Sequence, residues 1–391
     1  MQIRKITEGR ERIEASALSA YAFHVRVDDM EKFRVDSLKQ TFQDWGAFDD
    51  SGALMAHIIN NQYTSRLDGH SVRNGGIGGV STYPEYRVSG AVKNIFRALL
   101  PAAYADGEVI STLYPFSHAF YRKAGYETVC VKNVYTLKPE VLRDYRFTGE
   151  AVLWKDGDPV EEYLSLYSRF TEGLNLAIER TPEMMLENRI KAEFLKDRRF
   201  SYLLKENGKA VAYVIFQDTY RPESALLQVQ DLAWDGRAGF LAILGFLARF
   251  SADYGDIKLP LPTDTELLSL LHSAKHYDVE KTSVFSYMIR AVNARKLLSL
   301  IRKPEDAAFT VRVSDDIIPE NNGTFAVRGE EAVPTDTSPD LDVSIQALGQ
   351  LCCGAVSLSE AELREDVTVL SNRSSLSAVF TRKPLWISDH F

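Results

Sequence analysis

The chain has 391 residues, which is more than one ordinary hydrophobic core holds, so we expect two or three domains. A net charge of −8 and a pI near 5.5 argue against binding to nucleic acid or to an anionic membrane. The cysteines Cys130, Cys352 and Cys353 are too few for a disulfide framework or a cysteine-rich metal site, so a reducing, cytoplasmic setting is expected.

The first 145 residues have the pattern of one α/β unit. Helical spacing over 10–22 and 29–42 is followed by a hairpin over 45–59, which turns at Asp50-Ser51-Gly52. A strand, a helix, a strand, a short helix and a strand are expected next, over 76–83, 88–104, 108–114, 117–124 and 127–137.

A second unit begins near residue 150 and has the same order of elements. Two helices, a hairpin, a strand and a helix are predicted over 158–174, 181–194, 203–216, 225–233 and 237–253. Aligned on the first hairpin, the second places Gly208, Ala212 and Ile215 beside Gly52, Ala56 and Ile59. A generic hairpin would explain this short match as well, but a strand and a helix follow in the same order as in the first unit, so we expect a duplicated fold whose second copy has diverged. The helix G-F-L-A-I-L-G-F-L-A-R-F in this copy is too short to span a bilayer and is predicted to be buried.

The third unit starts near Val292 with a short amphipathic helix, N-A-R-K-L-L-S-L-I, followed by alternating runs that predict strands. A capping box is predicted at Ser359 and Glu362. The last residues, L-W-I-S-D-H-F, are unusually apolar for a terminus. We expect Leu385 to Ile387 to form a last strand of this small α+β domain.

The segment with the clearest chemical signal is G-G-I-G-G-V-S-T-Y-P-E-Y-R-V-S-G-A-V, residues 75–92. A glycine at the head of a helix lets backbone N–H groups approach an anion, and the helix dipole favours phosphate there. Arg87 and Lys93 could add positive charge, although a plain strand–turn–helix junction explains the same pattern. A Walker loop and the G-x-G-x-x-G dinucleotide fingerprint are both absent from it.

This segment resembles the acyl-CoA pyrophosphate loop of the GNAT superfamily of N-acetyltransferases, Arg/Gln-x-x-Gly-x-Gly/Ala. Arg87 and Gly90 match that loop, whereas Val92 departs from the small residue at its last position. The resemblance implies an acetyl-CoA site. Its cofactor-binding residues would be Val80, Ser81 and Thr82 on the strand and Arg87, Val88, Ser89, Gly90, Ala91 and Val92 in the loop.

A second match lies in F-Y-R-K-A-G-Y, where Tyr121, Gly125 and Tyr126 fit the Tyr-x-x-x-Gly-Tyr/Phe pattern of many such enzymes. The resemblance makes Tyr121 the acid that protonates the leaving CoA thiolate. A phenolate and a thiolate have similar basicities, so proton transfer from the phenol to the thiolate is reasonable. The alternative is a tyrosine that packs on the sheet.

The length and order of units resemble the enhanced intracellular survival (Eis) type of acetyltransferase. The fold class is then α+β (mixed α/β), with tandem acetyltransferase-type folds before a sterol-carrier-protein-like domain. The implied domains are a catalytic one at 1–147, a degenerate second copy at 148–290 and the carrier-like domain at 291–391.

The same resemblance implies transfer of acetyl from acetyl-CoA to primary amines of a small cationic acceptor, such as an aminoglycoside or a polyamine. It makes the terminal carboxylate of Phe391 a catalytic group that helps to deprotonate the amine, and it suggests a hexamer. Two alternatives are an acyltransferase acting on protein or peptide amines and a non-catalytic CoA- or lipid-binding protein.

Other ionisable residues have simpler explanations. Asp28 and Asp29 precede a helix and are expected to cap it, although they or Asp389 could attract a cationic amine. His24 and His118 could act as bases, but the sequence shows no acidic or nucleophilic partner at a characteristic spacing from either of them. His272 and His276 are four residues apart without a third ligand, so no metal site is expected.

Overall fold

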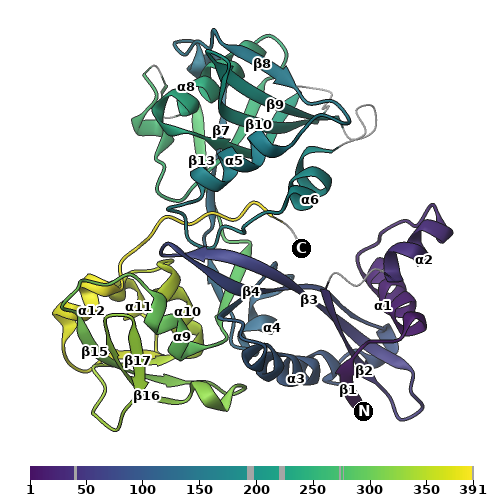
Figure 1. The fold of residues 1–391 in the computed structure, drawn as a ribbon, viewed down its shortest axis with the longest axis vertical. Helices are drawn as coiled ribbons and strands as arrows, with labels where there is room; N and C mark the ends of the chain where they lie inside the picture. Colours follow the sequence, from purple (N-terminus) through teal and green to yellow (C-terminus); the bar gives the residue numbers. More distant parts are fainter. Residues whose placement is uncertain (39–41, 192–197, 220–224, 273, 276, 390–391) are drawn as a thin grey trace. The chain divides into compact units, whose positions relative to one another are not determined.

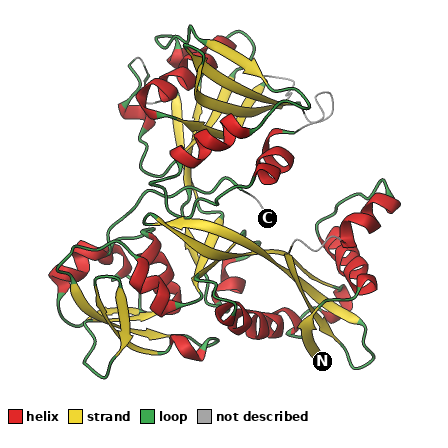
Figure 2. Cartoon of the chain, in the orientation of Figure 1, coloured by secondary structure: helices red, strands yellow, loops and turns green. Residues whose placement is uncertain are grey.

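The computed structural model describes residues 1–38, 42–191, 198–219, 225–272, 274, 275 and 277–389. These residues form two compact units, one of Met1–Val129 with Ser286–Arg382 and the other of Cys130–Phe285 with Lys383–Asp389. Each unit contains a seven-stranded mixed sheet, and the first also contains a five-stranded sheet (Figures 1 and 2). The predicted α+β (mixed α/β) class is confirmed.

The first sheet has the strand order β1-β2-β3-β4-β5-β14-β6. Its strands are β1 (Gln2–Lys5), β2 (Phe42–Phe48), β3 (Leu54–Leu67), β4 (His70–Thr82), β5 (Ile110–Leu113), β14 (Tyr287–Ala291) and β6 (Glu127–Val129). Neighbouring strands are antiparallel except β4 and β5, which run parallel and are joined by a helix. The hairpin that turns at Asp50-Ser51-Gly52 is confirmed.

Helices cover both faces of this sheet. They are α1 (Gly9–Ala22), α2 (Met30–Leu38), α3 (Ala91–Ala105) and α4 (His118–Arg122). The apolar side of α3 packs with Ala56 and Ile58 of β3 in one core cluster. Leu18 of α1 packs with Phe48 and Leu54 in another. Successive strand residues point to opposite faces, but a register shift between Ala47 and Phe48 leaves Met55 unpaired and places Leu54 on the α1 face although Ala56 lies on the α3 face.

The second sheet has the same layout, with the order β8-β9-β10-β11-β12-β7-β13. Its strands are β8 (Glu150–Leu153), β9 (Arg199–Glu206), β10 (Lys209–Thr219), β11 (Leu226–Trp234), β12 (Asp256–Leu261), β7 (Lys132–Leu137) and β13 (Val279–Val284). Its helices include α5 (Glu161–Phe170), α6 (Pro182–Met185) and α8 (Gly236–Leu247), and a π-helical turn covers Leu186–Ile190. Strands β11 and β12 are the parallel pair of this copy.

The two sheets exchange one strand each. Strand β7 follows β6 in the chain but pairs with β12 and β13, and β14 follows β13 but pairs with β5 and β6. The single strand predicted over 127–137 is therefore wrong, because the chain leaves the first sheet after Val129 and enters the second at Lys132. Alternation of apolar residues continues through both strands, so the sequence hides the break.

The five-stranded sheet has the order β17-β16-β15-β18-β19. Its strands are β15 (Ala308–Ser314), β16 (Gly323–Arg328), β17 (Glu331–Pro334), β18 (Leu341–Ser344) and β19 (Val367–Val369), and its helices are α9 (Ala294–Leu300), α10 (Ile345–Cys353), α11 (Leu358–Ala361) and α12 (Arg373–Val379). The capping box lies two residues earlier than predicted, at Ser357 and Glu360.

Buried polar contacts tie this C-terminal part to the first sheet. Glu127 of β6 accepts hydrogen bonds from Arg122 and, 2.9 Å away, from Arg364. Arg290 of β14 is fully buried, donates to the carbonyl oxygen of Ala124 at 2.8 Å and forms an ion pair with Asp315 at 2.7 Å. Ala124 closes the turn that follows α4, so Asp315 supports the end of that helix through Arg290.

We predict that Gly125→Ala destabilises the protein strongly. Gly125 has φ +84°, which costs a non-glycine residue about 1–2 kcal/mol, and a Cβ there would lie 1.4 Å from Nη1 of Arg290. Displacing a buried, paired guanidinium adds about 2 kcal/mol or more to the loss in unfolding free energy. Chemical denaturation measures it. Gly52→Ala is the matched control, because Gly52 has φ +86° and open space around it. Equal losses in the two variants would contradict the prediction.

Candidate active site

Strands β4 and β5 stop pairing halfway along β4. Their parallel register runs from Asn74↔Ile110 to Ile77↔Leu113, whereas β4 continues to Thr82. At this point β4 also bulges, because Gly79 and Val80 together face the single residue Ile58 of β3. Gly79 has φ +59°, which a glycine adopts without strain. The backbone of β4 beyond Ile77 is thus released from β5 and can pair with an extended ligand.

The loop between β4 and α3 forms an anion-binding turn. A short 3-10 turn at Pro84–Tyr86 is followed by Val88 at φ +62° and by Gly90 at φ +81°, which is the N-cap of α3. The amides at the start of a helix lack intrahelical acceptors, and the helix dipole makes this end positive. Ser89 Oγ accepts from the Ala91 amide at 3.3 Å. Val92 is buried against the α3 core, so its bulk is directed away from the loop surface.

Tyr121 lies in α4, which begins after the N-cap Ser117, whose hydroxyl accepts from the Phe120 amide at 3.4 Å. Its ring is 2% exposed and makes edge contacts with Phe96, Phe116 and Tyr126. Burial raises the pKa of the phenol well above its ordinary value, because a phenolate there would lose its hydration. Tyr121 therefore stays protonated, as a proton donor must before the reaction.

Tyr126 supports the strand on which the ligand would lie. Ser111 Oγ donates to the carbonyl oxygen of Gly75 at 2.7 Å, so the Tyr126 hydroxyl, 2.7 Å away, must be the donor to Ser111. Tyr126 is fully buried, and burial raises its pKa. It is a structural tyrosine that connects α4 to β5 and β4.

The α1 face of the sheet carries a polar chain that the sequence analysis missed. His57 of β3 is 1% exposed, and its Nε2 lies 2.7 Å from Oδ1 of Asp44 on β2. Its Nδ1 lies 3.1 Å from Oγ of Ser19 on α1, and this oxygen is 3.5 Å from Oγ of Ser81. Strand pairing in the hairpin predicted over 45–59, continued by one residue, could have placed Asp44 near His57, but nothing local points to Ser19.

The second copy has the equivalent opening, and the chain itself fills it. Strands β11 and β12 pair only from Leu226↔Asp256 to Gln228↔Lys258, and β11 then bulges at Gln230. The segment Lys383–Asp389 lies here. Leu385 exchanges hydrogen bonds with Thr263, just past β12, at 2.9 and 3.3 Å. Ser388 Oγ donates to Asp231 of β11 at 2.9 Å.

Leu385 to Ile387 therefore do not form a strand of the third domain, as we expected. Leu385 forms an isolated parallel bridge with Asn175, and Trp386 is fully buried in a core cluster with Tyr163 and Tyr213. The indole of Trp386 buries more apolar surface in this aromatic core than it would in a strand at the edge of a small sheet.

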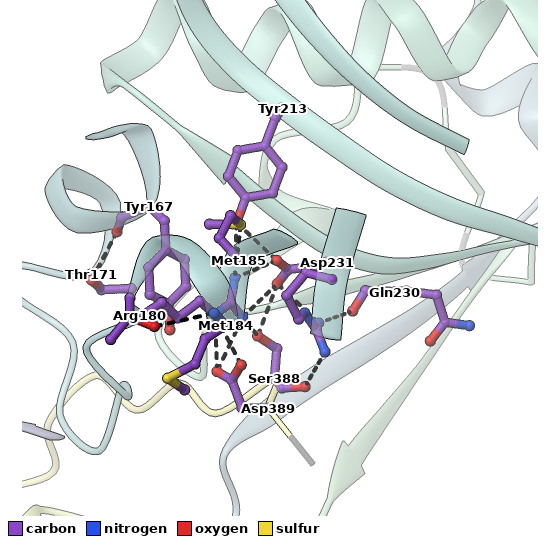
Figure 3. A network of polar contacts seen from close by, with 12 residues as sticks. Tyr167, Thr171, Arg180, Met184, Met185, Tyr213, Gln230, Asp231, Ser388 and Asp389 are labelled. Atoms are coloured by element: carbon purple, nitrogen blue, oxygen red, sulfur yellow. Dashed lines mark hydrogen bonds and ion pairs between the residues drawn. The ribbon is translucent and has the colours of Figure 1, made fainter. Parts of the chain in front are cut away.

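A buried ionic network fixes the end of this segment (Figure 3). The Arg180 guanidinium lies between two carboxylates, with Nη1 2.6 Å from Asp231 and Nε 2.9 Å from Asp389. Arg189 donates to the Ser388 carbonyl oxygen at 3.1 Å and lies 3.3 Å from Asp231. Burial would raise the pKa of Asp231, but the two arginines outweigh it and hold that pKa below its usual range. Asp389 is thus a structural anchor.

Lys132 borders the same network. Burial and the charge of Arg189 lower its pKa to about 8, against the opposing pull of Asp231 and Asp389. Two arginines already balance the two aspartates, so a further positive charge gains little there.

The remaining predicted residues are dispersed. Asp29 Oδ1 accepts from the Lys32 amide at 2.9 Å, so capping of α2 is confirmed. His24 and His118 are exposed. His272 packs on Tyr145, while His276 and Phe391 lie outside the described residues. Within the described ranges, no group of three or more His, Cys, Asp or Glu side chains could hold a metal ion.

Known protein families match two regions of the chain. Residues 2–129 match the acetyltransferase (GNAT) domain, and residues 289–388 match the sterol carrier protein domain. Among curated protein sequences, none matches the chain at a significant level.

Solved structures match over the full length. A probable N-acyltransferase from Enterococcus faecalis has a TM-score of 0.85 at 21% identity, with 100% of both chains covered. A GCN5-related N-acetyltransferase from Anabaena variabilis has 0.85 at 19%, again with 100% of both chains covered. Eis1 from Mycobacterium abscessus has 0.83 at 19%, with the same coverage.

These matches confirm the expected architecture, a GNAT acetyltransferase fold of the Eis type with a sterol-carrier-like C-terminal domain. Residues 2–129 are therefore an acetyltransferase domain of the GNAT type. Over the part of the chain that the structure describes, no helix has the length and hydropathy needed to cross a membrane.

Proposed function

We propose that this GNAT-type enzyme transfers the acetyl group of acetyl-CoA to a primary amine of a small cationic acceptor, either an aminoglycoside or a polyamine. The observation that carries the proposal is the release of β4 from β5 after Ile77, next to a buried, protonated Tyr121. The opening accommodates an extended pantetheine arm, and the tyrosine supplies the proton that a CoA thiolate needs to leave.

The proposed cosubstrate site has two parts. Backbone groups of Val80, Ser81 and Thr82 would pair with the pantetheine arm and polarise the thioester carbonyl. The loop would bind the pyrophosphate through amides of Val88, Ser89 and Gly90 and of the first helical residues, Ala91 and Val92, with Arg87 adding charge. The positive φ values of Val88 and Gly90 support this assignment, because they turn successive amides to one side.

The proposed roles of the C-terminus rest on the anchored segment before it. Arg180, Arg189 and Asp231 fix Ser388 and Asp389 in a buried network, so the chain leaves this network only two residues before Phe391. We propose that the Phe391 carboxylate holds the ammonium form of the acceptor in the active site.

The proposal keeps the domain boundaries 1–147, 148–290 and 291–391, a cytoplasmic location and a hexameric assembly, as the Eis-type resemblance implies. It includes no nucleic-acid or membrane partner and no metal. The acidic net charge of −8 favours a cationic acceptor over an anionic one. An acyltransferase for protein amines and a CoA- or lipid-binding protein without activity remain the alternatives.

Arg87→Glu is predicted to weaken acetyl-CoA binding, because it replaces a cation near the pyrophosphate by an anion. A charged hydrogen bond contributes about 1.5–3 kcal/mol, so the Kd should rise at least ~10-fold in isothermal titration. The control is Arg97→Glu, which makes the same charge change on an exposed position of α3 two turns farther on. If the wild type fails to bind acetyl-CoA at millimolar concentration, the enzyme assignment of this site fails. If both variants weaken acetyl-CoA binding equally, the loop is not the pyrophosphate site.

Tyr121→Phe is predicted to lower kcat about 100-fold while leaving the Kd of acetyl-CoA unchanged, because the substitution removes only the proton donor. Steady-state acetylation of 1,4-diaminobutane measures the rate. Tyr126→Phe is the control, since it deletes a buried hydroxyl bonded to Ser111 and should cost stability but little kcat. A wild-type rate in Tyr121→Phe would leave Tyr121 with a packing role alone.

Two residues added after Phe391 are predicted to reduce kcat about 100-fold with no change in acetyl-CoA affinity, because they move the terminal carboxylate. The same two residues added before Met1 serve as the control. Unaltered turnover in the C-terminally extended enzyme would refute the carboxylate role.

A further inference from the structure

We propose that Asp44, His57 and Ser19 form a proton relay that takes the proton from the acceptor amine, with Ser19 as the group that touches the amine. This inference rests on the proposed function, because it uses the position of the thioester at the β4 bulge. It gives these residues the task of accepting the proton, whereas the chain terminus holds the ammonium form of the acceptor.

The strands build the buried half of the relay. His57 faces Gly46 directly across β3 and β2, and Asp44 lies two residues along β2 on the same face. Both side chains are buried, at 1% and 9% exposure, on the α1 face of the sheet. A histidine in this position satisfies the Asp44 carboxylate without water, and a carboxylate at 2.7 Å stabilises the imidazolium that would form on protonation.

The carboxylate also decides which ring nitrogen can accept a proton. An ionised Asp44 only accepts hydrogen bonds, so the neutral His57 must carry its hydrogen on Nε2. Nδ1 is then an acceptor, and the Ser19 hydroxyl at 3.1 Å donates to it. Ser19 Oγ is also 3.4 Å from the Gly79 carbonyl oxygen, but Nδ1 of His57 is the closer acceptor for its single proton.

Ser19 connects the buried pair to the reaction site. Its side chain is half-buried, whereas His57 is not accessible. Its hydroxyl lies within 3.5 Å of Gly79, which is in the bulge where β4 has left β5, and of Ser81, just after that bulge. A hydroxyl that donates to His57 keeps its lone pairs for an N–H group. An ammonium that approaches the proposed thioester from the α1 side would therefore meet this oxygen.

The relay removes one proton from the acceptor amine. One N–H bond of the ammonium breaks, and its proton goes to Ser19 Oγ as the serine proton moves to His57 Nδ1. The resulting imidazolium is paired with Asp44, and the neutral amine attacks the thioester carbonyl. A second N–H proton is released as the amide forms, and it replaces the one that Tyr121 gives to the CoA thiolate. His57 returns its proton to solvent through Ser19 after the product leaves.

The test compares two acceptors of the same length and different basicity. 1,4-Diaminobutane is protonated at neutral pH and needs the relay, whereas its 2,2,3,3-tetrafluoro derivative is largely neutral and does not. His57→Gln keeps an N–H for Asp44 and an oxygen for Ser19 but has no basic atom. We expect it to lower kcat at least ~10-fold with the diamine and less than ~3-fold with the fluorinated diamine. The Kd of acetyl-CoA and the melting temperature should stay unchanged.

Further variants distinguish a role in proton transfer from a purely structural role of these side chains. Ser19→Ala should reproduce the pattern of His57→Gln, and Ser19→Thr should restore the rate, because it keeps the hydroxyl. His70→Gln, at the start of β4, is the matched control and should leave both rates intact. Equal losses with the two diamines, or no loss with either, overturn the relay.

A second measurement needs no acceptor. Nitrogen-15 NMR of histidine-labelled enzyme at alkaline pH should show the Nε2–H tautomer for His57, assigned by the signal missing in His57→Gln. An Nδ1–H tautomer overturns the relay, since Nδ1 could not accept from Ser19. If the wild-type enzyme acetylates neither diamine, the proposed acceptor class fails, and the tautomer still decides the relay.

Discussion

Backbone hydrogen-bonding groups that leave a sheet need new partners, and this requirement organises both halves of the protein. In each copy the parallel pair separates next to a bulge, at Gly79 in β4 and at Gln230 in β11. The second opening is filled by Lys383–Asp389, with Trp386 buried in its core. The first is followed by a glycine-capped helix and is available to a ligand. One fold thus supplies a cosubstrate site and an anchor for its own terminal segment.

The bulged strand also separates two kinds of chemistry. Tyr121 packs with the α3 core, where burial keeps its phenol protonated. His57 and Asp44 point to the α1 face, where Nε2 of the ring lies 2.7 Å from the buried carboxylate. Donor and acceptor of protons are then held apart by the sheet, and the proposed thioester lies at the bulge between them.

The sterol-carrier-like domain contributes to the active site without touching the proposed ligands. Asp315 holds Arg290, and Arg290 holds the carbonyl oxygen of Ala124 at the end of α4, the helix that carries Tyr121. Glu127, three residues later, joins Arg122 of α4 to Arg364 of the C-terminal part. Arg290, Asp315 and Glu127 are buried and paired, so loss of one partner is costly. The position of Tyr121 therefore depends on residues far along the chain.

Local signals in the sequence determined the glycine-capped turn before α3, the turn at Gly125 after α4, the hairpin of the second copy and the position of the GNAT and sterol-carrier-like domains. These features depend on short-range physics, such as the positive φ of Gly90 and Gly125 and the apolar periodicity of α3. Only the tertiary structure decided which strands are neighbours. Periodicity shows which face is buried but not which sheet buries it, so the exchange of β7 and β14 was invisible. For the same reason only the fold could bring Ser19 to His57 and place Trp386 in the second unit, since both contacts join segments that are distant in the chain.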